Sequence, residues 1–292
     1  MFKRVLFPTD FSEYADKTLE YVLRLKSTGV ETVLLVHIME AADEYPVTMA
    51  RKERFTERLE ETARLVREQG LQAEVLVELG KPYREILRLA DERDASLIVI
   101  GCHGKGFLDE VVIGSVSDRV TREANVPVLL VKYKVQESDA GPQLENRSAE
   151  PFGKVLYPTD CSPCAQSALQ FVRELKRVGC QEVIVSSVID PKVVATANID
   201  TAVKELESKL KVSVGTLRER GLKAKSIVPV GVPLEELLRI AKEERVSLVV
   251  MGSTGKGYFQ EMLLGSLSEN MIRKSKCPIL VIHNDVCALQ VD

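Results

Sequence analysis

The chain contains 292 residues, of which 45% are hydrophobic and 28% are charged, a balance typical of soluble globular proteins. This length favours two domains of ordinary size over one. The net charge of −3 excludes the strongly basic surface that attracts nucleic acid, and no apolar run reaches the ~18 residues of a membrane span. Six cysteines are too few and too scattered for a secreted disulfide framework. These properties predict a cytoplasmic two-domain protein.

The two halves of the sequence are copies of one another. Residues 2–10 recur at 152–160 with the same Pro-Thr-Asp ending, and later glycines and prolines recur at an offset of 151. A repeat of this length indicates a duplicated domain, because solenoid repeats are much shorter. The segment between the copies is polar and rich in turn residues, as a linker is. We therefore expect domain 1 at 1–134, a linker at 135–151, domain 2 at 152–284 and a C-terminal tail at 285–292.

Within each copy, apolar β-branched runs alternate with segments of helical periodicity. In the first copy, strands are predicted at 4–8, 32–38, 73–77, 96–100 and 127–131. Helices are predicted between them at about 12–28, 47–69, 82–93 and 114–124. In the second copy, strands are predicted at 154–157, 182–188, 224–228, 247–251 and 278–282. Strands that are apolar on both faces and separated by helices predict an α/β fold, with two doubly wound five-stranded parallel-sheet domains in tandem.

A glycine-rich element follows the fourth predicted strand of each copy, with the spacing G-x2-G-x9-G-S. Its members are Gly101, Gly104, Gly114, Ser115 and Ser117 in the first copy, and Gly252, Gly255, Gly265, Ser266 and Ser268 in the second. Glycine allows backbone N–H groups to approach a phosphate chain closely, and the start of the following helix attracts anions. The element therefore predicts a phosphate site with serine hydroxyls as further donors. The alternative is that these glycines only form turns between strand and helix.

The sequence resembles a tandem member of the universal stress protein family, of the ATP-binding type. The resemblance depends on the glycine element and on Pro8-Thr9-Asp10 and Pro158-Thr159-Asp160, which follow the first strand of each copy. It implies a Rossmann-like fold similar to that of the adenine nucleotide alpha hydrolases. It also implies that ATP, AMP or another adenine nucleotide binds together with Mg²⁺ or Mn²⁺.

The resemblance further implies roles for individual residues. The glycine element would hold the triphosphate, and Asp10 and Asp160 would lie near the ribose and the metal-bound phosphates. Ile38 and Val188 would meet adenine through their backbone. From the residues alone, each aspartate has a second interpretation as a cap of the helix that follows.

The family resemblance also implies how the two halves associate. Their fifth strands, 127–131 and 278–282, would pair in an intramolecular pseudo-dimer. A further homodimer and a protein partner of unknown identity are additional options. Nucleic acid and membranes are not expected as partners.

Cys161 and Cys164 form a C-x-x-C pair at the start of a predicted helix in the second copy. Such a pair can support redox exchange, because a helix start favours the thiolate. The first copy has Phe11 and Tyr14 at these positions, so the pair is not part of the common design. A redox role and simple packing both remain open for these cysteines.

These observations favour a regulatory or stress-response protein in which nucleotide occupancy acts as a conformational switch. The alternative is an enzyme of the same fold, either a slow ATPase or a nucleotidyl-transferring enzyme. Efficient hydrolysis needs a group that positions water, and no catalytic triad or carboxylate pair stands out in the sequence. Catalytic residues are therefore not assigned.

Overall fold

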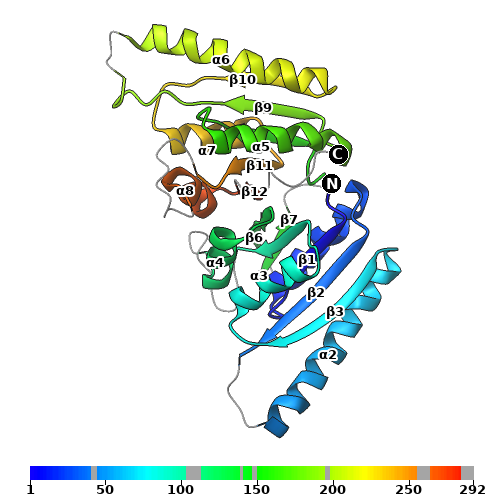
Figure 1. Ribbon diagram of the computed structural model, residues 1–292. Coiled ribbons are helices and arrows are strands. Elements are labelled where there is room, and N and C mark those ends of the chain that lie inside the picture. The colour runs from blue at the N-terminus through cyan, green and yellow to red at the C-terminus, as the bar shows by residue number, and fades with distance from the viewer. Residues whose placement is uncertain are drawn as a thin grey trace. The chain divides into compact units, whose positions relative to one another are not determined.

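The computed structural model describes residues 1–40, 45–102, 113–138, 141–146, 150–194, 198–254 and 264–283. The chain forms two compact units, Met1–Asn146 and Arg147–Asp292, and each contains a parallel sheet with helices packed on it (Figure 1). The predicted fold class, two doubly wound five-stranded parallel sheets in tandem, is confirmed.

In the first unit the strand order is β5-β4-β1-β2-β3, and all neighbours are parallel. The strands are β1 (Arg4–Pro8), β2 (Thr32–Met39), β3 (Gln72–Leu79), β4 (Leu97–Gly101) and β5 (Val128–Val131). The helices are α1 (Glu13–Arg24), the 3₁₀ turn η1 (Leu25–Thr28), α2 (Tyr45–Glu68), α3 (Pro82–Glu92) and α4 (Ser115–Glu123). The strand order reverses between β1 and β4, which is where ligands bind in such sheets.

The second unit repeats this arrangement with the order β10-β9-β8-β11-β12. Its strands are β8 (Lys154–Pro158), β9 (Glu182–Ser186), β10 (Lys223–Ile227), β11 (Leu248–Gly252) and β12 (Ile279–Ile282). Its helices are α5 (Pro163–Glu174), η2 (Leu175–Val178), α6 (Ile199–Glu219), α7 (Pro233–Glu243) and α8 (Ser266–Lys274). The reversal here lies between β8 and β11.

The sheets are buried on both faces. Val33, Leu34 and Leu35 are consecutive residues of β2, and each is 0% exposed. Successive side chains of a strand point to opposite faces, so helices cover both sides of this sheet. Helices α3 and α4 pack against each other, as do α7 and α8 in the second unit. The continuous apolar runs in the sequence follow from this two-sided burial.

Two local features differ from the predicted elements. The strand predicted at 182–188 ends at Ser186, and Ile189 returns to the sheet only as an isolated bridge to Val230. The segment predicted as a linker contains an antiparallel hairpin of β6 (Tyr133–Ser138) and β7 (Gly141–Asn146). Its polar composition concealed the hairpin, because backbone groups form the hydrogen bonds between the two strands.

Gly252 ends β11 where helix α5 approaches the strand. A Cβ added to Gly252 would lie 2.6 Å from the Sγ of Cys164 and 3.2 Å from its carbonyl oxygen. Cys164 lies in the first turn of α5 and is 3% exposed. Gly252 is therefore required for the packing of this helix on the strand, independently of any ligand.

We expect Gly252→Ala to lower the free energy of unfolding by about 1–3 kcal/mol, the usual cost of overpacking a core. Cys164→Ala should also destabilise, because it removes buried contacts. The double variant should lose less stability than the sum of the two changes, since the missing sulfur relieves part of the clash. Urea unfolding of the three variants measures this coupling, and strictly additive losses would contradict the proposed contact.

Candidate functional site

A pocket opens at the carboxyl ends of the strands in each unit. Its volume is about 290 Å³ in the first unit and about 620 Å³ in the second. The first pocket is lined by Pro8, Thr9, Asp10, Ile38, Gly101, Gly114, Ser115 and Ser117. The second is lined by Pro158, Thr159, Asp160, Val188, Gly252, Gly265, Ser266 and Ser268. All of these are residues that the sequence predicts for the site, whereas the predicted Gly104 and Gly255 lie outside the described residues.

The turn after the first strand of each unit is held by its own side chains. In the first unit, Asp10 Oδ1 accepts the Ser12 N–H at 2.9 Å, and Thr9 Oγ1 accepts the Phe11 N–H at 3.0 Å. The turn of the second unit has the same bonds, made by Asp160 at 2.9 Å and Thr159 at 3.0 Å. Each aspartate therefore orders the turn before the helix and also lines the pocket. Its second interpretation, as a cap of the helix, is wrong, because Ser12 and Ser162 are the N-cap residues and accept from the helix N–H groups.

The turn residue that follows each aspartate adopts a left-handed conformation. Phe11 has a φ of 57° and Cys161 a φ of 61°, a region that few side chains other than asparagine and aspartate occupy readily. The hydrogen bonds to Thr9 and Asp10, and to their counterparts, offset this cost. The conserved geometry of the two turns thus comes from side-chain acceptors and not from glycine.

The backbone of Ile38 faces the first pocket. The Thr9 N–H donates to the Val36 carbonyl at 2.8 Å, so the polar groups of Val36 point toward β1. Backbone groups in a parallel strand alternate between its two neighbours, and those of Ile38 therefore point to the same side. Because β1 ends at Pro8, they face the pocket instead of a strand.

The same argument applies to Val188 in the second unit. The Thr159 N–H donates to the Ser186 carbonyl at 2.8 Å, and the Ile189 N–H donates to Pro229 on the opposite side at 2.9 Å. Val188 lies between these residues and faces the pocket that it lines. Both positions therefore present an N–H and a carbonyl at a fixed spacing, which suits the edge of a planar base.

Helices α4 and α8 begin at the pockets without a side-chain cap. Gly114 and Gly265 are the N-cap residues, and neither helix start has a hydrogen bond from a capping side chain. The first N–H groups of a helix have no partner within the helix and form the positive end of its dipole. Ser115 and Ser266 open these helices and are exposed at the pockets. Each pocket thus has a cluster of donors suited to an anion.

The second serine of each element has a structural hydrogen bond. Ser117 donates to the Gly101 carbonyl at 2.7 Å, and Ser268 donates to the Gly252 carbonyl at 3.0 Å. Both serines are only 6% exposed. A hydroxyl has a single proton to donate, so these two bonds fasten the helix to the end of the fourth strand. A contact of Ser117 or Ser268 with phosphate stays a prediction.

Thr254 is a pocket residue that the sequence did not single out. It lines the second pocket and is 8% exposed, and its Oγ1 has no hydrogen-bond partner among the described residues. A buried hydroxyl without a partner is costly in free energy. The counterpart of Thr254 in the first copy is His103, so comparison of the two copies concealed it. The position of Thr254 between Gly252 and Gly255, inside the glycine-rich element, is the sequence signal that could have identified it as a pocket residue.

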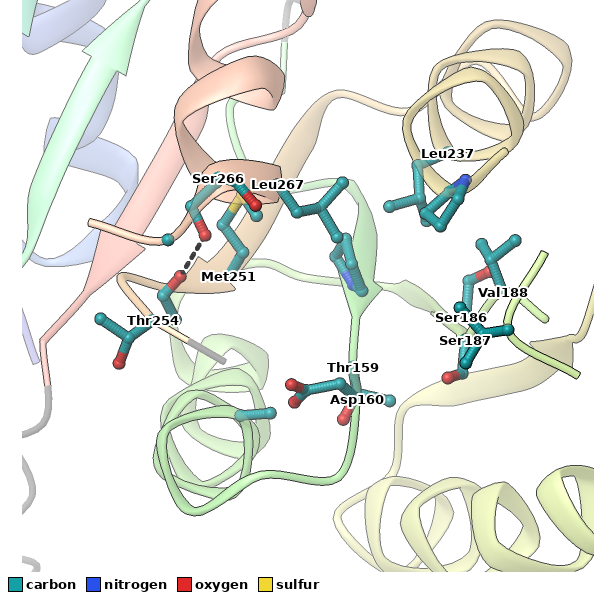
Figure 2. Close-up of a pocket in the computed structure, with 17 residues that line it drawn as sticks. Thr159, Asp160, Ser186, Ser187, Val188, Leu237, Met251, Thr254, Ser266 and Leu267 are labelled. Atoms are coloured by element: carbon teal, nitrogen blue, oxygen red, sulfur yellow. Dashed lines mark hydrogen bonds between the residues drawn. The ribbon is translucent and has the colours of Figure 1, made fainter. Parts of the chain in front are cut away.

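Hydroxyl-bearing and apolar side chains both line the second pocket (Figure 2). Thr254 and Ser266 lie on one side of it with Met251, and Val188 and Leu237 lie on the other with Ser186 and Ser187. Asp160 and Thr159 lie between these groups. The hydroxyls of Thr254 and Ser266 suit anionic groups of a ligand, and Val188 and Leu237 on the other side suit an apolar ring system.

The first pocket differs because an aromatic cluster surrounds His37. The His37 ring lies 4.6 Å from that of Phe11 and 4.3 Å from that of Phe55, and the two phenylalanine rings stack at 5.7 Å. The Arg58 guanidinium lies 4.2 Å over the Phe11 ring. His37 Nδ1 is 2.8 Å from the Thr9 carbonyl oxygen, and a carbonyl can only accept, so Nδ1 holds a proton.

The C-x-x-C cysteines occupy different environments. Cys161 is half-buried beside Asp160, whereas Cys164 is buried with its Sγ 3.9 Å from the Ile282 carbonyl and 4.0 Å from the Ser253 hydroxyl. These contacts agree with a packing role for Cys164, and a redox role for the pair stays a prediction. Elsewhere, burial raises the pKa of the Cys180 thiol to about 12, which disfavours its reactive thiolate.

Both halves of the chain match the model of the universal stress protein family, over residues 1–132 and 151–283. The chain belongs to the universal stress protein family. The universal stress protein MJ0577 of Methanocaldococcus jannaschii is 37% identical over 153 residues, which cover 45% of this chain and 94% of that protein. The universal stress protein Sll1654 of Synechocystis is 32% identical over 135 residues, which cover 45% of this chain and 86% of that protein.

A solved structure matches the two units together. The universal stress protein from Archaeoglobus fulgidus DSM 4304 superimposes with a TM-score of 0.74 at 26% identity, over 96% of this chain and 98% of that chain. This family membership agrees with the tandem arrangement predicted from the repeat. Among the described residues, the helices are too short or too polar to cross a membrane, and no group of three or more His, Cys, Asp or Glu side chains forms a metal cluster.

The two serines of the α8 start should differ in their effect on stability. Ser268→Ala leaves the buried Gly252 carbonyl without its donor, and we expect it to lower the free energy of unfolding by about 1–3 kcal/mol. Ser266→Ala changes an exposed position and should alter stability by no more than about 0.5 kcal/mol. Thermal and urea unfolding of both variants measure the difference. Equal effects of the two substitutions would contradict the structural role of Ser268.

Proposed function

We propose that each unit binds an adenine nucleotide, with ATP as the principal ligand, and that occupancy acts as a conformational switch in a stress response. The proposal rests on one observation. In each unit the same pocket is lined by a helix start without a side-chain cap and by Ile38 or Val188, whose backbone N–H and carbonyl face the pocket. The helix start suits the phosphates, and the backbone edge suits the base. Family membership and the two intact glycine elements support the same ligand.

The donor set at each pocket suits a nucleotide with its metal ion. Phosphate oxygens would accept from the first N–H groups of α4 and α8 and from the Ser115 and Ser266 hydroxyls. Asp10 and Asp160 supply a carboxylate in each pocket, and Mg²⁺ prefers one or two carboxylates together with phosphate oxygens. Mg²⁺ would therefore enter with the nucleotide and balance the charge of its phosphates.

A ligand in this position would connect parts of the fold that are distant in sequence. In the first unit these are the end of β2 at Ile38, the turn at Asp10 and the start of α4 at Ser115. The ligand binds most tightly to the conformation in which all three are in place, and so its occupancy shifts the population toward that state. This is the physical basis that we propose for a switch.

Substitution of the N-cap glycines should remove the sites one at a time. Gly114 and Gly265 have extended backbones, with φ and ψ of −62° and 145° and of −74° and 153°, which valine tolerates. The valine side chain would cover the first N–H groups of the helix. At ATP concentrations that saturate both sites, Gly114→Val and Gly265→Val should each lose half of the bound nucleotide. Equilibrium dialysis measures the stoichiometry, and circular dichroism controls for folding.

Two results would count against this assignment. Unchanged stoichiometry in both folded variants would show that the glycine elements do not form the sites. Rapid release of phosphate from ATP with Mg²⁺ would favour the alternative of an ATPase. Among the described residues, the ionisable side chains that line the pockets are Asp10, His37 and Asp160, and both aspartates already order their turns. These bonds favour binding over efficient hydrolysis.

Thr254 provides a test of the side of the second pocket that it lines with Ser266. Thr254→Val keeps the shape of the side chain and removes the buried hydroxyl, so the free energy of unfolding should stay the same or rise slightly. If the hydroxyl bonds to the nucleotide, the affinity of the second site should fall about tenfold. Thr254→Ser is the matched control, since it retains the hydroxyl. Calorimetric titration in the Gly114→Val background isolates this site, and equal affinities of the valine and serine variants would exclude the contact.

The proposed association of the two halves is a separate prediction. Pairing of their fifth strands, a further homodimer and a protein partner each require their own test. Sedimentation analysis with and without nucleotide would address the homodimer.

A further inference from the structure

The two pockets differ at the position of His37. The corresponding residue of the second unit is Ser187, and both residues line their pockets beside the backbone edge that faces the ligand. An imidazole ring occupies space that a serine hydroxymethyl group does not. The cavity volume is about 290 Å³ in the first unit and about 620 Å³ in the second, a difference larger than one imidazole ring, of which His37 accounts for a part. Pockets for ligands of drug size range from roughly 300 to 1,000 Å³, so only the second lies well within that range.

The His37 ring is held by contacts on several sides. Its Nδ1 donates to the Thr9 carbonyl. Phe11 contacts the ring from the turn, and Phe55 contacts it from α2. Arg58 covers the outer face of Phe11 and lies 3.5 Å from its carbonyl oxygen. A ligand that needs the space of the imidazole must displace the ring and break several of these contacts.

The second unit has smaller or differently placed side chains at the matching positions. Cys161 replaces Phe11 at the turn, and Ser187 replaces His37 at the end of the strand. In addition, β9 ends at Ser186, whereas β2 continues to Met39 and remains paired with β3. Ser187 and Val188 therefore lie outside the strand, between the hydrogen bonds of Ser186 and Ile189 to the neighbouring segments.

We infer that the two pockets are not equivalent: the second binds the nucleoside triphosphate first, and His37 with its aromatic cluster makes the first pocket the weaker site. This inference rests on the proposed nucleotide function and adds an order of filling to it. The protein then responds in two steps, with the second unit occupied at low nucleotide concentration and the first only at higher concentration.

Isothermal titration of nucleotide-stripped full-length protein with ATP and Mg²⁺ tests this order. We expect two dissociation constants that differ by about tenfold or more, a separation that calorimetry resolves. Gly265→Val should remove the tighter site and Gly114→Val the weaker one. These variants assign each binding step to a unit, and neither measurement depends on turnover.

Substitutions at His37 and Ser187 test whether these side chains cause the difference in affinity between the two sites. In His37→Asn the amide nitrogen can keep the hydrogen bond to Thr9 while the outer part of the ring is removed. We expect this variant to tighten the weaker site until the two constants differ by less than about threefold. Ser187→His should weaken the tighter site. Phe55→Leu, which loosens the support of His37 without entering the pocket, should tighten the first site by a smaller factor.

Each outcome of these titrations has a definite meaning. Two equal constants, or a tighter site that is lost in Gly114→Val, would overturn the order of filling and leave nucleotide binding intact. Unequal sites that His37→Asn does not bring closer would overturn the role of His37. Failure of the folded, stripped protein to bind any adenine nucleotide would overturn the proposed function, and the inference with it.

Discussion

The reversal of strand order beside the first strand of each unit is the constraint on which the site depends. β1 is paired with β2 on one side and β4 on the other, and the chain leaves these strands in opposite directions. The carboxyl ends of β1 and β4 therefore border the pocket of this unit. The turn at Asp10, the end of β2 and the start of α4 surround this space because each continues from a strand beside it. The second unit repeats this arrangement at β8 and β11.

Equivalent hydrogen bonds hold the strand ends around this space in both units. Thr9 and Thr159 extend the ladder by one bond to the neighbouring strand, and Ser117 and Ser268 join the fourth helix to the fourth strand. These bonds use backbone groups or short hydroxyl side chains. Larger side chains at the rim can therefore vary without altering the frame, and the two copies have diverged at positions such as His37 and Ser187.

The sequence predicted the strands and the turns at their ends well, because these depend on local sequence patterns. Apolar runs located the strands of both sheets, and the recurrence of Pro-Thr-Asp and of the glycine element identified several of the residues that line each pocket. Features that depend on distant contacts were not predicted. The clash that makes Gly252 necessary involves Cys164 on another element, and the end of β9 at Ser186 depends on its partner strand. The hairpin of β6 and β7 was missed because its composition is polar.

The sequence by itself determined the duplication, the fold class and the turn and glycine-element residues that line each pocket, since these follow from periodicity and from spacing along the chain. Only the tertiary structure decided which serine is exposed at the helix start and which is tied to a strand, because Ser115 and Ser117 differ by their distance from Gly101. It also decided that the pockets are unequal. Phe11, His37 and Phe55 are separated along the chain and meet only when α2 packs on the sheet. A side chain's partners are set by folding, and a single sequence does not record them.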